Sequence, residues 1–433
     1  MAGKGGLTPA LAAAAAQLPP GDVVVALSGG PDSAVAAWLL SHRPGPGAVA
    51  AVFVDHGWPG SASLRQAAAA IAAHLCIPLQ IVTVAGSSTE GEARRLRLAA
   101  LEAAAAGRPV VTGHHAGDVA ETVVGNLLRG AGSTGLAGIP GARSPFVRPL
   151  LAVPSHEVRS LADAEALPFV DDPANADPAH RRNRIRHQVM PVLAAAEPSA
   201  EAAIGRAARL LGDDDRMLED LAAAVPLTPA VDGVLIPFGA LAAQPRPVAA
   251  RIARRALRTV RPPYAGDAAD VDRILAVARG TTLDLGGGLR CERDGAFVAV
   301  YDPERTPGPF PAIPLPVPGD VVVAGHAVMA AWAPERLLPP WRAEAALDTA
   351  LAGSLLVRPS RPGEHIDIGE GSKPVAEALS EAAVGRRLRA GWPVVAARGK
   401  IAWLVGVRVA AWARAPATGT VLQLTARPTT ERP

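Results

Sequence analysis

The chain contains 433 residues, more than one ordinary hydrophobic core accommodates, so two or three domains are expected. Its formal net charge is only +3 and no run of eighteen apolar residues occurs, so the composition predicts no membrane span and no membrane partner. Cys76 and Cys291 lie far apart, which argues against a disulfide scaffold, a zinc knuckle and an iron–sulfur cluster. We expect both thiols to be buried.

The amino-terminal half reads as an α/β domain. Residues 7–18 are rich in alanine and lead through Pro19-Pro20-Gly21 into an apolar strand, which favours a short helix over a signal peptide. Residues 22–190 then alternate short apolar runs with alanine-rich helical stretches, a pattern typical of a parallel sheet flanked by helices. The predicted strands cover residues 23–27, 49–54, 79–84 and 110–112.

The first predicted strand runs into a glycine-containing loop that opens a helix, Ser28-Gly29-Gly30-Pro31-Asp32-Ser33. Glycines let the backbone turn tightly and approach an anion closely, and a helix N-terminus offers free N–H groups to it. The loop therefore predicts a phosphate site, although it lacks the Gly-Lys-Ser/Thr ending of a Walker A loop. A simple helix cap made by Asp32 and Ser33 is the alternative.

The fourth predicted strand opens onto Gly113-His114-His115. Ligands of open parallel sheets bind beyond the carboxyl ends of the strands, so this segment and the glycine loop are expected at one cleft. Asp118 and Glu121 follow three residues apart at a helix start, so both can face the same side. Acidic residues are also common in a first helical turn because of the helix dipole, and that explanation stays open.

An arginine-rich segment, Arg181-Arg182-Asn183-Arg184-Ile185-Arg186, follows Asp171 and Asp172. Beside a phosphate-binding cleft such a cluster can stabilise pyrophosphate or hold RNA phosphate. The alternative is a basic helix start that pairs with the two aspartates.

The rest of the chain divides by composition. Residues 196–305 are mostly helical, residues 306–350 are proline-rich with short strands, and residues 351–433 suggest a small α+β or β-rich module. In the helical part, four arginines at i, i+3, i+4 and i+7 share one helix face, namely Arg251, Arg254, Arg255 and Arg258. That face is either a solvated surface or a surface that binds RNA phosphates.

Together these segments resemble the tRNA(Ile)-lysidine synthetase family of the PP-loop, or ATP-pyrophosphatase, superfamily. The tract from His114-His115 to Glu121-Thr122 resembles the family's His-His-x-Asp-Asp-Gln-x-Glu-Thr, with Val119 at the Gln position, and residues 182–186 match its Arg-Asn-x-x-Arg. Gly117 stands where the first acidic residue is usual. Residues 357–364, with Arg361, resemble the start of the family's C-terminal domain.

The resemblance implies an enzyme that ligates L-lysine to C2 of the wobble cytidine, position 34, of tRNA(Ile) with a CAU anticodon. The cytidine is first adenylated by ATP, and AMP and pyrophosphate are released as lysidine forms. A cytoplasmic location follows from these substrates. The sequence does not fix the oligomeric state, and a homodimer stays open.

The resemblance also assigns roles to residues. ATP would bind the loop of residues 28–33 (Ser28, Gly29, Gly30, Pro31, Asp32 and Ser33), with Asp32 organising Mg²⁺ or pyrophosphate. Lysine would bind Asp118 and Glu121. The catalytic set would be Asp32, with His114 or His115 to orient the nucleotide or move a proton, and Arg182 and Arg186 to offset phosphate charge. The tRNA would contact Arg251, Arg254, Arg255, Arg258 and Arg361.

These assignments give four stretches: a PP-loop ATP-binding catalytic domain over 1–195, a mainly helical tRNA-contacting domain over 196–305, a linker with short strands over 306–350, and a C-terminal tRNA-binding domain over 351–433. Two other functions stay open. One is a PP-loop ligase that adenylates a small molecule, and the other is a non-enzymatic RNA-binding relative, suggested by Gly117.

Overall fold

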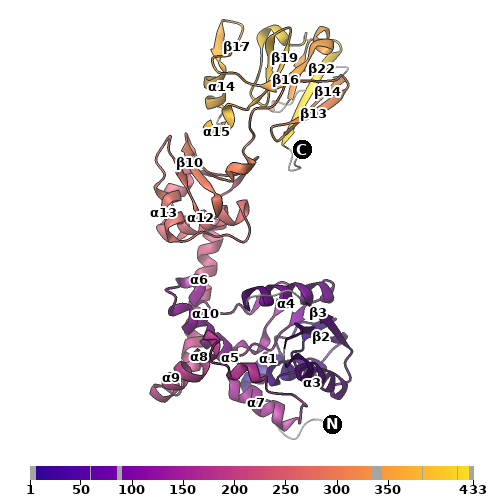
Figure 1. The fold of residues 1–433 in the computed structure, drawn as a ribbon, viewed down its shortest axis with the longest axis vertical. Coiled ribbons are helices and arrows are strands. Elements are labelled where there is room, and N and C mark those ends of the chain that lie inside the picture. The colour runs from indigo at the N-terminus through magenta and orange to yellow at the C-terminus, as the bar shows by residue number, and fades with distance from the viewer. Residues whose placement is uncertain are drawn as a thin grey trace. The chain divides into compact units, whose positions relative to one another are not determined.

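The computed structural model describes residues 6–58, 60–84, 90–333, 344–382, 384–416 and 418–428 (Figure 1). The chain forms two compact units, Met1–Met217 and Leu218–Pro433. None of the helices in the described ranges is long and apolar enough to cross a membrane.

The first unit is built on a six-stranded sheet in the order β3-β2-β1-β4-β6-β5. Its strands are β1 (Val23–Ala26), β2 (Val49–Asp55), β3 (Leu79–Thr83), β4 (Val110–Val111), β5 (Ala142–Arg143) and β6 (Phe146–Val147). Every pairing among β1, β2, β3, β4 and β6 is parallel, and only β5 runs antiparallel to its neighbour. The predicted parallel sheet is therefore confirmed, and β1 and β4 end side by side.

Helices cover both faces of this sheet because its strands are apolar on both sides. Val23 and Val25 of β1 pack into one core with α2 and α3, whereas Val24 points to the opposite face and packs with Leu101 of α4. The helices of this unit are α1 (Pro9–Ala15), α2 (Pro31–Ser41), α3 (Ser61–His74), α4 (Glu90–Ala105), α5 (Ala116–Leu127), α6 (Ser133–Leu136), η1 (Pro149–Ala152), α7 (Ser155–Ala164), η2 (Pro173–Ala176), α8 (Arg181–Arg184), η3 (Ile185–Val189), α9 (Met190–Ala196) and α10 (Ala200–Ala223), whose end belongs to the second unit.

The second unit begins with a five-stranded antiparallel sheet in the order β7-β8-β11-β10-β9. It comprises β7 (Thr228–Ala230), β8 (Gly233–Pro237), β9 (Thr282–Asp284), β10 (Arg290–Asp294) and β11 (Phe297–Tyr301), with helices α11 (Phe238–Ala242), α12 (Arg246–Val260) and α13 (Ala268–Ala276). The helices agree with the mainly helical character predicted for residues 196–305. The sheet was not predicted, because strands of three to five residues are too short to show an alternating pattern.

The end of the chain is rich in β-structure, as predicted. Two antiparallel sheets have the orders β12-β16-β19-β20-β21 and β13-β14-β22-β15, and β17 pairs with β18. The elements are β12 (Ile313–Pro314), β13 (Gly319–Val323), β14 (His326–Ala333), β15 (Glu344–Leu347), β16 (Leu356–Pro359), β17 (His365–Asp367), β18 (Ser372–Pro374), α14 (Val375–Glu381), α15 (Arg386–Arg389), β19 (Pro393–Ala397), β20 (Lys400–Leu404), β21 (Arg408–Val409) and β22 (Val421–Pro428). Part of the predicted 306–350 linker, residues 334–343, lies outside the described residues.

The two cysteines differ in environment. Cys291 is buried in β10, and burial raises the pKa of its thiol to about 12. Cys76 is exposed, so the expectation that both thiols are buried was wrong for this residue. Cys76 follows the end of α3 with a positive φ of 54°, and this helix-terminating turn carries its side chain away from the core.

Candidate active site

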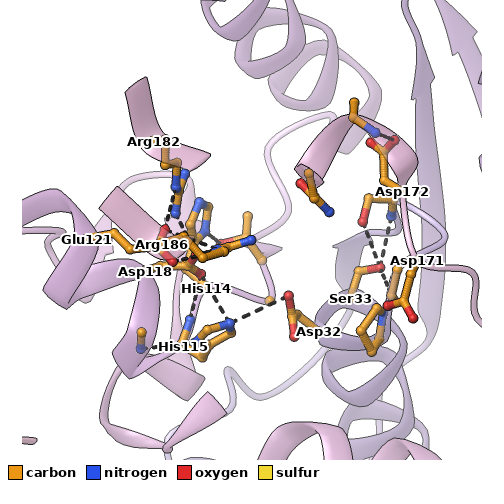
Figure 2. A pocket seen from close by; sticks show the side chains of 18 of the residues that line it. Asp32, Ser33, His114, His115, Asp118, Glu121, Asp171, Asp172, Arg182 and Arg186 are labelled. Carbon is orange, nitrogen blue, oxygen red and sulfur yellow. Dashed lines mark hydrogen bonds and ion pairs between the residues drawn. The ribbon is translucent and has the colours of Figure 1, made fainter. Parts of the chain in front are cut away.

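A large pocket opens at the carboxyl ends of β1, β2 and β4 (Figure 2). Residues of the predicted glycine loop, His114, His115, Asp118, Glu121, Arg182 and Arg186 all line it. These side chains come from segments up to about 160 residues apart in the chain, so the fold gathers most of the predicted site residues at one sheet edge.

The shape of the glycine loop requires a glycine at position 29. Gly29 has a φ of +88°, and a Cβ atom there would lie 2.4 Å from the carbonyl oxygen of Leu64. Ser33 braces the loop, because its Oγ accepts from the N–H of Ser28 and donates to the carbonyl of Gly30, each at 3.0 Å. The N-cap of α2 is Gly30, which has no side chain to occupy the first-turn N–H groups. Those groups are thus available to an anion.

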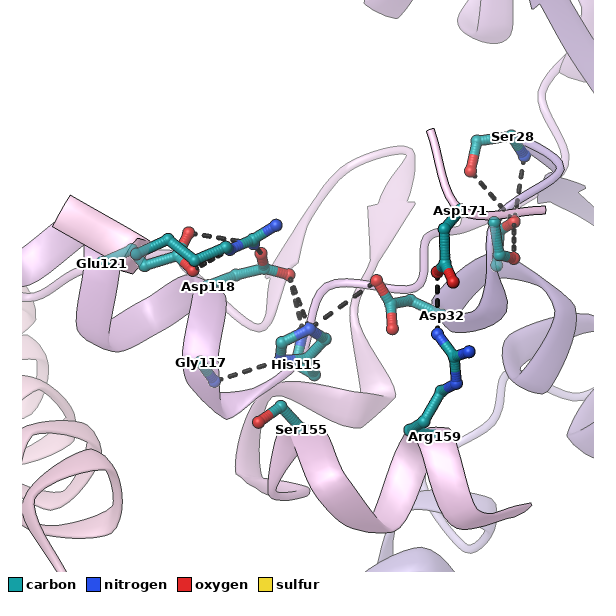
Figure 3. A network of polar contacts seen from close by, with 12 residues as sticks. Ser28, Asp32, His115, Gly117, Asp118, Glu121, Ser155, Arg159 and Asp171 are labelled. Atoms are coloured by element: carbon teal, nitrogen blue, oxygen red, sulfur yellow. Dashed lines mark hydrogen bonds and ion pairs between the residues drawn. The ribbon is translucent and has the colours of Figure 1, made fainter. Parts of the chain in front are cut away.

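The loop after β4 lies directly against the start of α2. A Cβ atom on Gly113 would approach the carbonyl carbon of Asp32 to 2.5 Å, so only glycine permits this contact. The contact brings His115 Nε2 to 3.7 Å from Asp32 Oδ2 (Figure 3). His115 also caps α5, since its Nδ1 accepts from the N–H of Gly117 and its own N–H donates to Asp118 Oδ2.

Two carboxylates of α5 and two guanidiniums of α8 and η3 form ion pairs in the pocket. Asp118 and Glu121 are 7% and 5% exposed. Arg182 donates from Nε to Glu121 at 2.8 Å and from Nη2 to Asp118 at 2.5 Å, and Arg186 donates from Nη2 to Glu121 at 3.1 Å (Figure 2). The candidate lysine-binding carboxylates are therefore partnered by the candidate phosphate-binding arginines, and the charges of these four side chains cancel.

The titratable groups respond to burial and to one another. Burial would raise the pKa of Asp118, but the charges of His115 and Arg182 outweigh it and hold that pKa below its usual value. Burial raises the pKa of Asp32 despite the opposing effect of His115. Burial also lowers the pKa of His114 to about 4, so its ring is neutral near pH 7, with Nδ1 at 2.8 Å from Thr112 Oγ1.

The low pKa of His114 predicts a loss of stability in acid. Between its ordinary pKa of 6.5 and about 4, the unfolded chain binds a proton that the folded chain does not. The free energy of unfolding therefore falls as the pH is lowered through this window, by about 1–2 kcal/mol at pH 5. His114→Gln should lose less stability than the wild type between pH 7 and pH 5 in urea unfolding. Replacing the exposed His74 by Gln is the control, and equal losses in all three proteins would contradict the prediction.

The four arginines of α12 do not form an open basic face. Arg251 is 8% exposed and lies 3.6 Å from Glu219, Arg254 donates to the carbonyl of Gly266 at 2.9 Å, and Arg255 donates to the carbonyls that end α10. The guanidiniums of these three are bonded within the unit, and the RNA-binding role assigned to them stays a prediction. Arg258 is about half exposed and its guanidinium pairs with Glu219 at 4.0 Å. Arg361 is also exposed, in the β-rich part.

Several pocket residues were not predicted. Trp58 is 50% exposed and stacks on His56 with a centroid distance of 5.0 Å, just beyond β2. Glu201, in the first turn of α10, also lines the pocket. His56 and Trp58 follow the end of a predicted strand, and this position could have indicated that they lie at the pocket. Nothing in the sequence around Glu201 indicates that it returns to the strand ends.

Comparison with known proteins gives the following matches. The family description "PP-loop domain" matches residues 8–193, and "TilS substrate C-terminal domain" matches residues 355–424. The tRNA(Ile)-lysidine synthase of Symbiobacterium thermophilum is 34% identical over 448 aligned residues, covering 90% of each chain. That of Geobacter sulfurreducens is 30% identical, covering 90% of this chain and 89% of the relative. Among solved structures, the U34-tRNA thiolase NcsA of Methanococcus maripaludis has a TM-score of 0.40 and 22% identity, covering 47% of this chain and 78% of that one.

Proposed function

Because this chain belongs to the tRNA(Ile)-lysidine synthase family, we propose that its pocket adenylates the wobble cytidine of tRNA(Ile) and then joins lysine to it. The chain is a PP-loop ligase that uses ATP and modifies tRNA. The observation that carries the proposal for the site is the juxtaposition, in one pocket, of a phosphate-binding loop and a carboxylate–guanidinium cluster.

ATP binds with its phosphates at residues 28–33 and the N-terminus of α2. The donor chemistry of the pocket fits Mg²⁺ carried on ATP: the Asp32 side chain is 43% exposed and faces the pocket (Figure 2). No group of three or more metal-ligating side chains occurs among the described residues. Mg²⁺ on substrate phosphates needs only one or two protein carboxylates, so Asp32 would hold it. The ion would neutralise phosphate charge.

In the first step the C2 oxygen of the cytidine attacks the α-phosphorus, and pyrophosphate leaves. Arg182 and Arg186 are held within the pocket wall by Asp118 and Glu121, and their side chains remain 39% and 32% exposed. They can therefore offset charge that develops on the phosphates. Adenylation converts the C2 oxygen into a good leaving group.

In the second step the ε-amine of lysine attacks C2, and AMP leaves. Asp118 and Glu121 supply the carboxylates of the lysine site, and His114, neutral with its pKa of about 4, orients a substrate group by hydrogen bonding. His115 lies between Asp32 and Asp118 and is the better placed of the two histidines to move a proton. The exposed Arg258 and Arg361 contact the tRNA outside the pocket. Because the substrates are tRNA and free lysine, the reaction takes place in the cytoplasm.

The test is transfer of labelled lysine to unmodified tRNA(Ile) in the presence of ATP. We expect label to accumulate on the tRNA and to disappear when the wobble cytidine is replaced. Transfer to tRNA without that cytidine would contradict the proposal. ATP–pyrophosphate exchange that needs no tRNA would instead favour a ligase for a small molecule, and no exchange under any condition would favour a non-enzymatic relative.

A further inference from the structure

Glu201 brings a carboxylate to the place where position 117 lacks one. A Cβ atom on Gly117 would lie 3.6 Å from Glu201 Oε2 and 2.9 Å from the His115 ring. Gly117 therefore lies close to both the ring and the carboxylate, and a side chain at this position would press against the ring. Figure 3 shows Gly117 beside His115, with Ser155 below them.

Glu201 is held in place without a cationic partner. Its carboxylate accepts from the backbone N–H of Ser155 at 3.2 Å and from Ser155 Oγ at 3.3 Å. In the part of the chain that the structure describes, no arginine or lysine lies within ion-pair distance of it, whereas Asp171, another acidic residue of the pocket, pairs with Arg159 at 2.7 Å.

Unlike Glu201, two other carboxylates of the pocket have arginine partners. The charges of Asp118 and Glu121 are matched by those of Arg182 and Arg186. A lysine substrate adds an α-ammonium group that stays charged while the ε-amine attacks. A cation that leaves water needs a carboxylate whose charge is not already neutralised. Glu201 provides one, and its Oε2 lies 3.6 Å from the position that a Cβ atom of Gly117, the residue before Asp118, would take.

We propose that Glu201 binds the α-ammonium group of the lysine substrate, beside Asp118, and so selects an α-amino acid. The inference rests on the proposed function, because it assigns a residue to the lysine site of that reaction. It also explains how a chain with glycine at position 117 retains a third carboxylate at this wall.

The test compares Glu201→Gln with Glu197→Gln. In Glu201→Gln the amide oxygen still accepts from the Ser155 N–H, and the amide NH2 group is placed to donate to Ser155 Oγ, so the change removes the charge and keeps a bonding group at each contact. Glu197 is the matched control, because its carboxylate accepts from the N–H and Oγ of one serine, Ser199, at 3.0 and 2.8 Å, but does not line the pocket. The KM for lysine is measured along with inhibition by 6-aminohexanoate, which is lysine without its α-amino group.

Glu201→Gln should raise the KM for lysine about tenfold or more, the loss expected for one charge-assisted hydrogen bond. The inhibition constant of 6-aminohexanoate should change less than about twofold, and Glu197→Gln should change neither. Adenylation of tRNA measured without lysine should be far less affected. Glu201→Asp, which keeps the charge, should fall between the wild type and Glu201→Gln.

Two results would overturn the inference. One is an unchanged KM for lysine in a folded Glu201→Gln protein. It would mean that Glu201 only accepts hydrogen bonds from Ser155 at the start of α7 and does not bind the substrate. The other is an equal loss of affinity for lysine and 6-aminohexanoate, which would show a general distortion of the pocket. Failure of the wild type to transfer lysine at all would instead remove the proposed function itself, and this inference with it.

Discussion

Replacing Gly29 by alanine should reduce ATP-dependent adenylation of tRNA about a hundredfold or more. The φ of +88° at this position costs an alanine about 1–2 kcal/mol, and the new Cβ would lie 2.4 Å from the backbone oxygen of Leu64. A backbone atom cannot yield as a flexible side chain can. The loop that receives the phosphates must therefore shift, and a displacement near 1 Å at a reacting group costs about that factor in rate.

Gly60→Ala separates this clash from backbone strain. Gly60 has a φ of +92°, close to that of Gly29, but no atom lies within 4 Å of the position its Cβ would take. It does not line the pocket. Gly60→Ala should lose some stability and keep its adenylation rate within about threefold. Initial rates of ATP–pyrophosphate exchange with tRNA measure both variants, and similar losses in the two would show that the cradle at Gly29 is not the ATP site.

Replacing Asp118 by alanine should lower kcat/KM for lysine about a hundredfold or more, and ATP binding much less. Asp118 is buried, bonds Arg182 at 2.5 Å and is assigned to the lysine site, so its loss removes a substrate contact and leaves a guanidinium without that partner. Asp118→Asn retains an oxygen that accepts from the His115 N–H, and so keeps the cap of α5 while it removes the charge. It should show most of the same loss.

Asp163 provides the control for this pair of variants. It is an aspartate of α7 paired with Arg159 at 3.6 Å, but it is exposed and does not line the pocket. Asp163→Ala should therefore stay within about twofold of the wild type in both assays. Equal losses of lysine use and ATP binding in Asp118→Asn would refute the assignment of Asp118 to lysine.

The parts of the site that could be predicted from the sequence are those in which chemistry and local structure coincide. The loop of residues 28–33 follows a buried strand and opens a helix, and His114-His115 follows the neighbouring strand. Topology alone then brings Asp32 and His115 together, because β1 and β4 are adjacent parallel strands. The strand and helix periods of residues 22–190 were enough to predict that both loops face one cleft, but not that β1 and β4 are neighbours.

The pairing of Asp118 and Glu121 with the arginines could not be predicted. Arg182 and Asp118 are 64 residues apart, and each had a separate explanation as a helix-terminus charge. Only the fold of the intervening segment makes them partners. For Arg251 and Arg255 the helical spacing correctly predicted one common face. It could not predict that Glu219 and two backbone carbonyls would bond these arginines.

The position of Glu201 also could not be predicted from the sequence. The departure at Gly117 was visible in the sequence and suggested a missing carboxylate. The carboxylate that lies nearest comes from α10, more than 80 residues later, and reaches the pocket because Ser155 at the start of α7 holds it there. A function carried by one side chain on a distant helix leaves no local motif.

The central claim is that ATP activates the RNA base rather than the amino acid. It is tested most directly with ATP labelled at the α-phosphate, tRNA(Ile) and no lysine. The account predicts labelled AMP bound covalently to the wobble cytidine, released as free AMP when lysine is added. Label on lysine instead, or no label on RNA until lysine is present, would contradict it.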